Sequence, residues 1–338
     1  MKKKKKKNYW SFSITTYTRV EYISVYISFL MVFLATLLNP INLFHKMDRF
    51  GYLCRNSMII AFLCTTGFMT TRCLQTRHLP LGNLYESLMF LSWGFSLLYL
   101  ISDVRYRNRL SRAVLAPSAM LTHAFATSSL PQQMQYPTLL VPASQSHWLM
   151  THVSATSISY ITPLCGSLLA IVLLSLFYSD AGSSFVANLE NKIKERISIS
   201  PMNPCNNIWE RIDVQNYSYL LIFNSQKCQL INCLDKWAYQ MISLGFSLST
   251  IGILSGAVWA NEARGSYWSW DPKETWALVT RLIYAIYLHA KINGKQLGEG
   301  PALAASIGFF LVWICFLGVN LLGVGLHSYG WLAQRIEG

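Results

Sequence analysis

The chain has 338 residues, of which 52% are hydrophobic and only 13% are charged. This composition is too apolar for an ordinary soluble domain of that length and predicts a protein that spans a lipid bilayer. The formal net charge of +13 does not indicate a nucleic-acid partner, because Lys2 to Lys7 alone supply six of the charges and the remainder is typical of loops that orient membrane helices.

Stretches that are apolar enough to cross a bilayer, which takes about 20 residues, occur eight times along the chain. They cover residues 22–38, 57–71, 84–102, 113–130, 148–178, 238–260, 272–290 and 301–323. We therefore expect an all-α polytopic membrane protein with about eight transmembrane helices. The first four stretches define an N-terminal membrane half, residues 1–130, and the others define a second half, residues 131–338.

Lysine and arginine are distributed unevenly between the loops that join these stretches. One set of loops holds Lys46, Arg49, Arg55, Arg105, Arg107, Arg109, Arg112, Lys291 and Lys295, whereas the loop at 131–147 holds neither residue type. By the positive-inside rule, the first set lies on the cytoplasmic or stromal side. A polar insertion at 180–236 falls on the same side and is expected to be a loop.

The most informative stretch is Trp259–Trp276, which lies on the poorly charged side and has four tryptophans in eighteen residues. Membrane proteins place aromatic belts at headgroup level, and composition alone does not distinguish such a belt from a binding surface. Trp268 and Trp270 alternate beside Tyr267, however, and a non-helical segment with this order would present a planar aromatic shelf. Such a shelf suits a flat apolar macrocycle.

Asp271 marks the start of the next helix. It stands at the N-cap position, followed by Pro272 and, three residues after the cap, by Glu274. Asp271 is therefore a candidate both for capping and for a role at a binding site. His289 follows eighteen residues later. A rise of 1.5 Å per residue places it roughly 27 Å deeper, near the opposite face of the membrane core.

Two further histidines are predicted on the side of the aromatic segment, namely His152 at the start of the fifth span and His327 just after the eighth. Either one alone is more simply interpreted as a hydrogen-bonded interfacial histidine. Two neutral imidazoles make a six-coordinate haem, however, and the shared face favours that role. The histidines without such a context are interpreted as structural: His45, His78, His123 and His147.

Residues 268–276, Trp-Ser-Trp-Asp-Pro-Lys-Glu-Thr-Trp, are flanked by histidines before and after. They resemble the tryptophan-rich WWD domain of the CcsA family of cytochrome c biogenesis proteins. The stretches from Asn83 to Ser87 and from Gly323 to Gly330 resemble the plastid-encoded form of this family. The resemblance covers most of the chain.

The resemblance implies a haem-handling protein of the system II pathway, with its tryptophan-rich loop on the lumenal side of the chloroplast thylakoid membrane. Haem would be bound non-covalently, as b-type haem in transit. The residues carried over to the external haem site are His152 and His327 as axial ligands, with Trp268, Trp270, Asp271 and Trp276 beside them. His289 corresponds to a ligand of a second haem site, whose other histidine comes from a partner protein, Ccs1 (CcsB).

The function implied is the haem attachment step of c-type cytochrome biogenesis, as a subunit of a cytochrome c haem lyase. Its substrates would be apocytochromes c of the cytochrome f and cytochrome c6 types. A haem exporter without attachment activity would use the same residues. A dihaem electron-transfer protein of the cytochrome b kind would instead place its ligand pairs on facing helices inside the membrane.

Arg264 and Arg281 stand where the family usually has tryptophan. Arg281 lies about ten residues into a predicted span that has no carboxylate beyond Glu274, and an unpaired arginine at that depth costs several kcal/mol. A C-to-U change converts the arginine codon CGG to the tryptophan codon UGG. The fifth span differs in a similar way, because Met or Leu is expected at four of its positions and C-to-U changes convert Thr to Met, Ser to Leu and Pro to Leu. These positions are Thr151, Thr156, Ser159 and Pro163. We therefore hypothesise that the plastid transcript is edited and that the working protein has tryptophan at 264 and 281.

Overall fold

The computed structural model describes residues 2–45, 48–76, 78–105, 109–130, 135, 146–197, 207–293 and 299–322. Within these ranges the regular elements are helices, without a strand.

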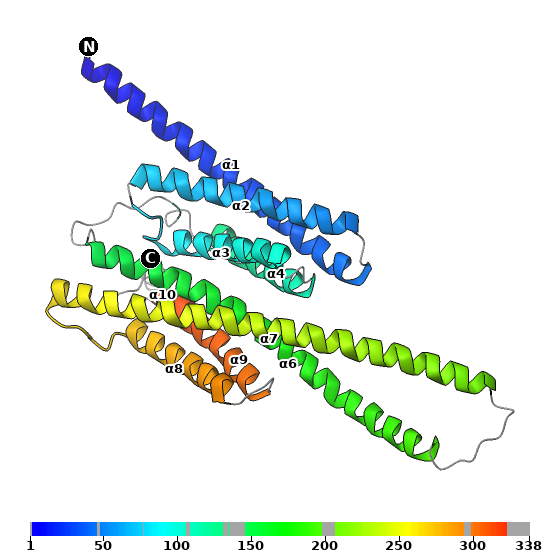
Figure 1. The fold of residues 1–338 in the computed structure, drawn as a ribbon. Coiled ribbons are helices and arrows are strands. Elements are labelled where there is room, and N and C mark those ends of the chain that lie inside the picture. Colours follow the sequence, from blue (N-terminus) through cyan, green and yellow to red (C-terminus); the bar gives the residue numbers. More distant parts are fainter. Residues whose placement is uncertain are drawn as a thin grey trace.

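The N-terminal half is a bundle of four packed helices (Figure 1). They are α1 (Lys2–His45), α2 (Asp48–Thr76), α3 (Leu84–Arg105) and α4 (Arg109–Ala124), the last continued by a π-helical turn, η1 (Phe125–Ser129). Asn83 caps α3, because its side-chain oxygen accepts a hydrogen bond from the Glu86 N–H at 2.8 Å. α3 packs against α2 and α4 and, across the two halves, against α6.

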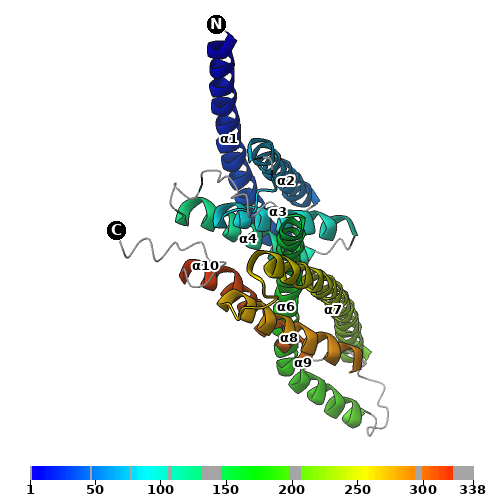
Figure 2. The same cartoon turned by 90° about the vertical axis from the view of Figure 1, so that its left-hand side faces the viewer.

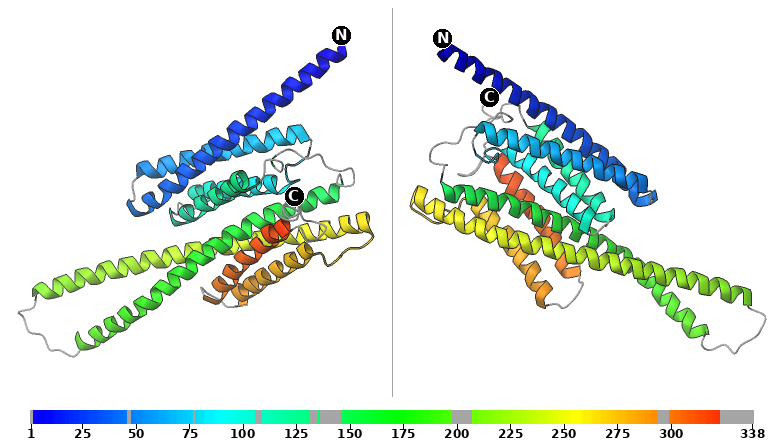
Figure 3. Two further views of the ribbon diagram at one scale, coloured as in Figure 1. Left: turned by 180° about the vertical axis from the view of Figure 1, so that it is seen from behind. Right: turned by 45° about the horizontal axis from the view of Figure 1, so that its top comes forward.

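The C-terminal half is built around two long helices that lie side by side (Figure 3). The elements of this half are α6 (His147–Ile197), α7 (Asn207–Arg264), α8 (Pro272–Asn293), α9 (Glu299–Trp313), η3 (Ile314–Gly318) and α10 (Val319–Leu322). α6 contacts α7 and α9 on one side and α3 and α4 on the other. It therefore joins the two halves, as the turned view shows (Figure 2).

Glycines bring α6 and α7 close together. A methyl group at Gly252 would lie 2.7 Å from Thr156 Cγ2, and one at Gly256 would lie 2.5 Å from His152 Nδ1. The spacing of four residues puts the two glycines on one face of α7, an arrangement that lets membrane helices approach closely. Because Gly256 has no side chain, the His152 ring lies directly against α7.

Six helical segments are long and apolar enough to span a bilayer. They are Arg19–Leu43, Arg49–Thr76, Leu84–Arg105, His147–Leu176, Gln229–Arg264 and Gly300–Gly318, within the described part of the chain. The all-α polytopic fold is therefore confirmed. The two other predicted spans, 113–130 and 272–290, are also helical, as α4 with η1 and as α8. α4 has only 16 residues and contains Pro117. α8 carries four charged residues, which lower its hydropathy.

The described part of the polar insertion at 180–236 is helical, whereas its composition predicted a loop. α6 continues to Ile197 and α7 begins at Asn207, and both helices project beyond the other helices of their half (Figure 1). A helix that is already nucleated adds one hydrogen bond per residue, so it continues past the end of an apolar stretch. The division of the chain at residue 130 stays a prediction.

Basic side chains form ion pairs where α2 begins, α3 ends, α4 begins and α8 ends. Asp103 of α3 lies 2.7 Å from Arg112 Nη1 and 3.4 Å from Arg55 Nε. Lys291, near the end of α8, lies 2.5 Å from Asp235 of α7. This end of the bundle, which carries the predicted basic loops, is termed the charged end.

Candidate functional site

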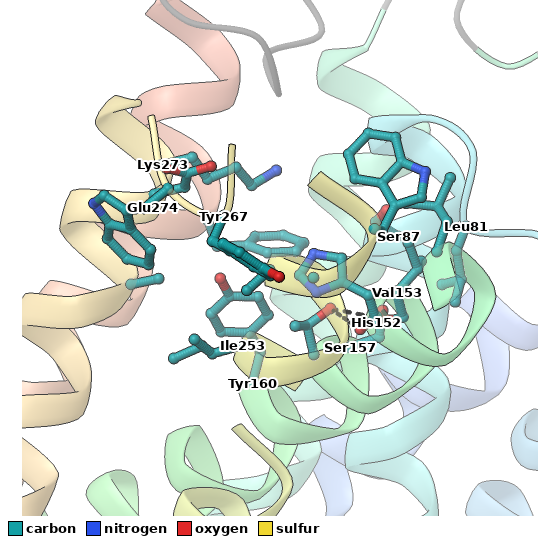
Figure 4. Close-up of a pocket in the computed structure, with 18 of the residues that line it drawn as sticks. Leu81, Ser87, His152, Val153, Ser157, Tyr160, Ile253, Tyr267, Lys273 and Glu274 are labelled. Carbon is teal, nitrogen blue, oxygen red and sulfur yellow. Dashed lines mark hydrogen bonds between the residues drawn. The ribbon is translucent and has the colours of Figure 1, made fainter. Parts of the chain in front are cut away.

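A cavity of about 380 Å³ lies at the other end of the bundle, among α3, α6, α7, α8 and η3 (Figure 4). Its volume falls in the range of about 300–1,000 Å³ that is typical of small-molecule sites. Its wall includes five aromatic side chains: Tyr160, Trp259, Tyr267, Trp268 and Phe316. Leu81 and Gly82, which precede α3, also line it. Both halves of the chain therefore build the cavity.

His152 of α6 lies in the cavity wall and is held by α7. Its Nδ1 is 2.6 Å from the carbonyl oxygen of Gly252. Because a carbonyl oxygen only accepts hydrogen bonds, Nδ1 carries the proton, and the lone pair of the neutral ring is on Nε2. Metal-binding histidines are commonly held in this way, with one ring nitrogen donating to a backbone carbonyl and the other binding the metal. The geometry therefore fits an iron ligand.

The segment at 265–271, between α7 and α8, covers one side of the cavity. α7 ends at Arg264, and Gly265 follows with a φ of 77°, as is usual for the residue that terminates a helix. Trp268 lines the cavity, whereas Trp270 is 72% exposed and has a φ of 57°, which is uncommon for a bulky residue. Their ring centroids are 6.1 Å apart and their planes meet at 84°. The planar shelf predicted from the sequence is therefore wrong, because the two rings meet edge to face.

Asp271 fulfils the predicted capping role. It is 6% exposed, and its Oδ2 accepts a hydrogen bond from the Lys273 N–H at 3.3 Å, in the first turn of α8. Trp276 is half-buried farther along this helix. Neither Asp271 nor Trp276 is among the described residues that line the cavity, so a direct role of either in binding stays a prediction.

Arg264 and Glu274 form an ion pair at the cavity wall. Arg264 Nη2 lies 3.2 Å from Glu274 Oε1, and the Ser269 N–H donates to Glu274 Oε2 at 3.0 Å. Burial alone would raise the pKa of the Glu274 carboxyl, which lies outside the six candidate spans, but hydrogen bonds from Ser269 and Arg264 lower it below its usual value. The sequence placed Glu274 in a helix-start pattern, three residues after the cap. In the structure Glu274 connects the preceding segment to α8 through Ser269 and Arg264.

Arg281, deeper in α8, has two partners among the residues that the structure describes, and neither is a carboxylate. Its Nη2 donates to Thr250 Oγ1 at 2.7 Å, and its guanidinium carbon lies 4.8 Å from the centre of the Phe246 ring. A cation over an aromatic face is attracted to it. Arg281 also lines a smaller cavity of about 50 Å³, which shares Thr156 and Tyr160 with the larger one. Tryptophan at 281 stays a prediction.

Of the two other candidate histidines, the structure describes His289 alone. His289 is exposed on α8, and its Nε2 lies 2.8 Å from Asn293 Nδ2. α8 is unbroken from Pro272 to Asn293, so the helical rise still separates His289 from Asp271 by roughly 27 Å. His327 lies outside the described residues.

Some cavity residues were missed by reasoning from motifs. Thr156 and Tyr160 line the cavity together with His152. Their spacing of four puts all three on one face of α6, so helical periodicity around His152 was a usable signal. Lys273 also lines the cavity. No sequence signal pointed to Lys273, because it belongs to the helix-start motif and only the placement of α8 brings it to the cavity.

Apolar helices around an aromatic cavity that is lined by a histidine define a polytopic helical membrane protein with a candidate small-molecule site. The family described as Cytochrome C assembly protein matches residues 81–327. The chain therefore belongs to this family and takes part in cytochrome c biogenesis.

Relatives named Cytochrome c biogenesis protein CcsA confirm the resemblance seen in the sequence. The chain is 72% identical to that of Adiantum capillus-veneris over 317 residues, which are 94% of this chain and 99% of the relative. It is 51% identical to that of Pinus thunbergii over 314 residues, which are 93% and 98% of the two chains.

A solved structure shares the fold. It is named Cytochrome c Heme Lyase CcmF, and it superposes with a TM-score of 0.61 at 13% identity over 95% of this chain. The chain spans about half of that protein's length, 49%. At this identity the likeness concerns the fold alone.

Proposed function

We propose that the cavity binds haem on the lumenal side of the plastid thylakoid membrane and presents it to apocytochrome c for thioether formation. The observation that carries the proposal is His152, which lies in an aromatic cavity with its Nδ1 turned to the Gly252 carbonyl. That orientation leaves the lone pair on the nitrogen that iron would use. The cavity has the size and the apolar wall of a small-molecule site.

His327 is proposed as the second axial ligand. Phe316 of η3 lines the cavity, and His327 follows it by eleven residues. The last described part of the chain thus leaves from the cavity wall, which supports this assignment. Two histidines would hold the iron until a histidine of the substrate replaces one of them.

The protein would contribute to the reaction by positioning haem beside the apocytochrome. Thioether bonds form when cysteine thiols add across haem vinyl groups, so haem itself supplies the reactive double bonds. Trp259, Tyr267 and Trp268 would pack against the ring and hold it beside the incoming apocytochrome, which supplies proximity. The chain would act in this way as a subunit of a haem lyase, on apocytochromes such as those of cytochrome f and cytochrome c6.

His289 is proposed to bind haem earlier, together with a histidine of Ccs1 (CcsB). Its exposed position on α8 leaves it accessible to another chain. It lies toward the charged end, which the positive-inside rule assigns to the stromal side. Haem would then pass from the charged end to the cavity.

The test compares His152→Ala with His147→Ala, a matched change at an exposed histidine on the same helix. The full chain is purified with its partner, its absorption spectrum is recorded, and thioether formation on an apocytochrome is assayed. His152→Ala should lose the bis-histidine spectrum, and His147→Ala should keep it. An unchanged spectrum in His152→Ala refutes the site. Haem binding without any thioether product in the wild type indicates a haem exporter instead.

A further inference from the structure

Three residues with full charges line the cavity as the structure describes it: Arg264, Lys273 and Glu274. Arg264 and Glu274 are paired with each other at 3.2 Å, so their charges largely cancel at the cavity wall. Lys273 is the third charged side chain among the described lining residues and lies outside that pair.

Lys273 is held at the cavity by the start of α8. It is the second residue of that helix, and its side chain extends from α8 toward the middle of the cavity (Figure 4). Asp271 attracts it electrostatically, but the Asp271 carboxylate caps the helix and does not line the cavity.

The surroundings of Lys273 favour an anionic ligand. Burial lowers the pKa of the Lys273 ammonium, and the nearby Cys315 and Asp271 oppose that effect. An opposite charge brought close to a partly desolvated ammonium stabilises its charged form. A carboxylate that enters with the ligand would supply such a charge, and charge-assisted hydrogen bonds of this kind are among the strong ones.

We propose that Lys273 binds a carboxylate of the cavity's ligand. This inference rests on the proposed function, under which the carboxylate is a propionate of haem. The two propionates lie on one edge of the haem ring, and the two vinyl groups lie on the other side. Lys273 therefore determines which edge of the ring faces α8.

The wall opposite Lys273 would then face the reactive edge of the ring. Figure 4 shows Lys273 on one side of His152, and Leu81 and Ser87 on the other. With a propionate at Lys273, the vinyl groups point toward Leu81 and Ser87, which belong to the N-terminal half.

The experiment compares two ligands, haem and its dimethyl ester, in which the propionates carry no charge. Both are titrated by absorption into the full chain purified with its partner. The proteins are the wild type, Lys273→Gln, Lys273→Arg and, as a matched control, Lys236→Gln, which removes an exposed lysine of α7. The wild type and the control should bind haem about tenfold more tightly than the ester, as one hydrogen bond to a charged group predicts.

Lys273→Gln should lose that preference and bind haem about tenfold more weakly, with ester binding unchanged. Lys273→Arg should keep most of the preference. If Lys273→Gln still prefers haem over the ester as the wild type does, the inference is overturned. If the wild type binds neither ligand, the proposed function itself fails.

Discussion

The two halves of the molecule handle buried polar groups in different ways. In the N-terminal half, Arg72 is 3% exposed and lies 3.3 Å from a carboxylate oxygen of both Glu21 and Glu86. Its charge is matched inside the protein. In the C-terminal half, His152 and Lys273 line a cavity, where a ligand can reach them. The first arrangement stabilises a fold, and the second provides a binding site.

The paired network nevertheless reaches the cavity. Glu86 Oε2 accepts a hydrogen bond from the Gly82 N–H at 2.9 Å, and Gly82 lines the cavity. The guanidinium of Arg72 also lies 5.4 Å from the centre of the Phe68 ring and 5.7 Å from that of Tyr85. The N-terminal half thus holds one wall of the site through its buried charges.

Replacing Arg72 with alanine should have the largest effect. It leaves two buried carboxylates without their cation, which lowers the free energy of unfolding by about 3–5 kcal/mol. Arg55→Ala is the control, because that arginine's side chain is 50% exposed in its pair with Asp103, and such pairs contribute about 0–1 kcal/mol. Denaturant unfolding in detergent micelles, followed by circular dichroism, measures both. Equal losses in the two variants would show that the Arg72 network does not stabilise the fold.

Gly256→Ala should damage the cavity half selectively. The added methyl group would lie 2.5 Å from His152 Nδ1, and overpacking of this kind costs about 1–3 kcal/mol. Displacement of the imidazole should weaken haem binding about tenfold, which corresponds to about 1.4 kcal/mol. Gly67→Ala is the matched control, since no atom lies within 4 Å of the added carbon there. Haem titrations of both variants decide the matter, and an affinity for Gly256→Ala equal to that of the control contradicts the prediction.

Arg281→Trp should stabilise the C-terminal half by about 1–2 kcal/mol. It removes a charge whose partners among the described residues are Thr250 and the Phe246 ring of α7, and arginine at the centre of a membrane helix costs about 2.5–3.5 kcal/mol. Thermal unfolding of both forms measures the gain. The editing hypothesis is tested separately, by comparing cDNA with genomic DNA at codons 264 and 281. Transcripts that keep arginine at both positions would refute it.

The smallest effect is expected from the two tryptophans of the aromatic segment. Trp268→Ala should weaken haem binding about fivefold, because Trp268 lines the cavity and an aromatic contact contributes about 0.5–1.5 kcal/mol. Trp270→Ala should change the affinity less than twofold, because Trp270 is 72% exposed, meets Trp268 edge to face and is not among the described residues that line the cavity. Titrations with haem measure the affinity of the two variants. A larger loss of haem affinity in Trp270→Ala than in Trp268→Ala would indicate that Trp270 contacts haem directly.

Local patterns in the sequence determined a good part of this protein. Apolar stretches of sufficient length predict membrane helices, because lipid leaves backbone groups no other partner than their own helix. Asp271 and Pro272 predicted the start of α8, and Asp271 does cap it. The tryptophan-rich segment and His152 marked the region of the cavity. Each of these signals acts within one helix or one short segment, which is why residue order alone reveals it.

Tertiary structure determined which other parts of the chain these segments contact. The contribution of Gly82 to the cavity depends on how α3 packs against α6, and the position of Lys273 depends on how α8 lies beside the cavity. The rings of Trp268 and Trp270 lie edge to face, and the backbone at Trp270 has a φ of 57°; the alternation of residues specifies neither. Arg281 contacts Thr250 and Phe246 of the neighbouring helix α7. Such partners are distant in sequence, and periodicity specifies the face of each helix but not the helix that packs against it.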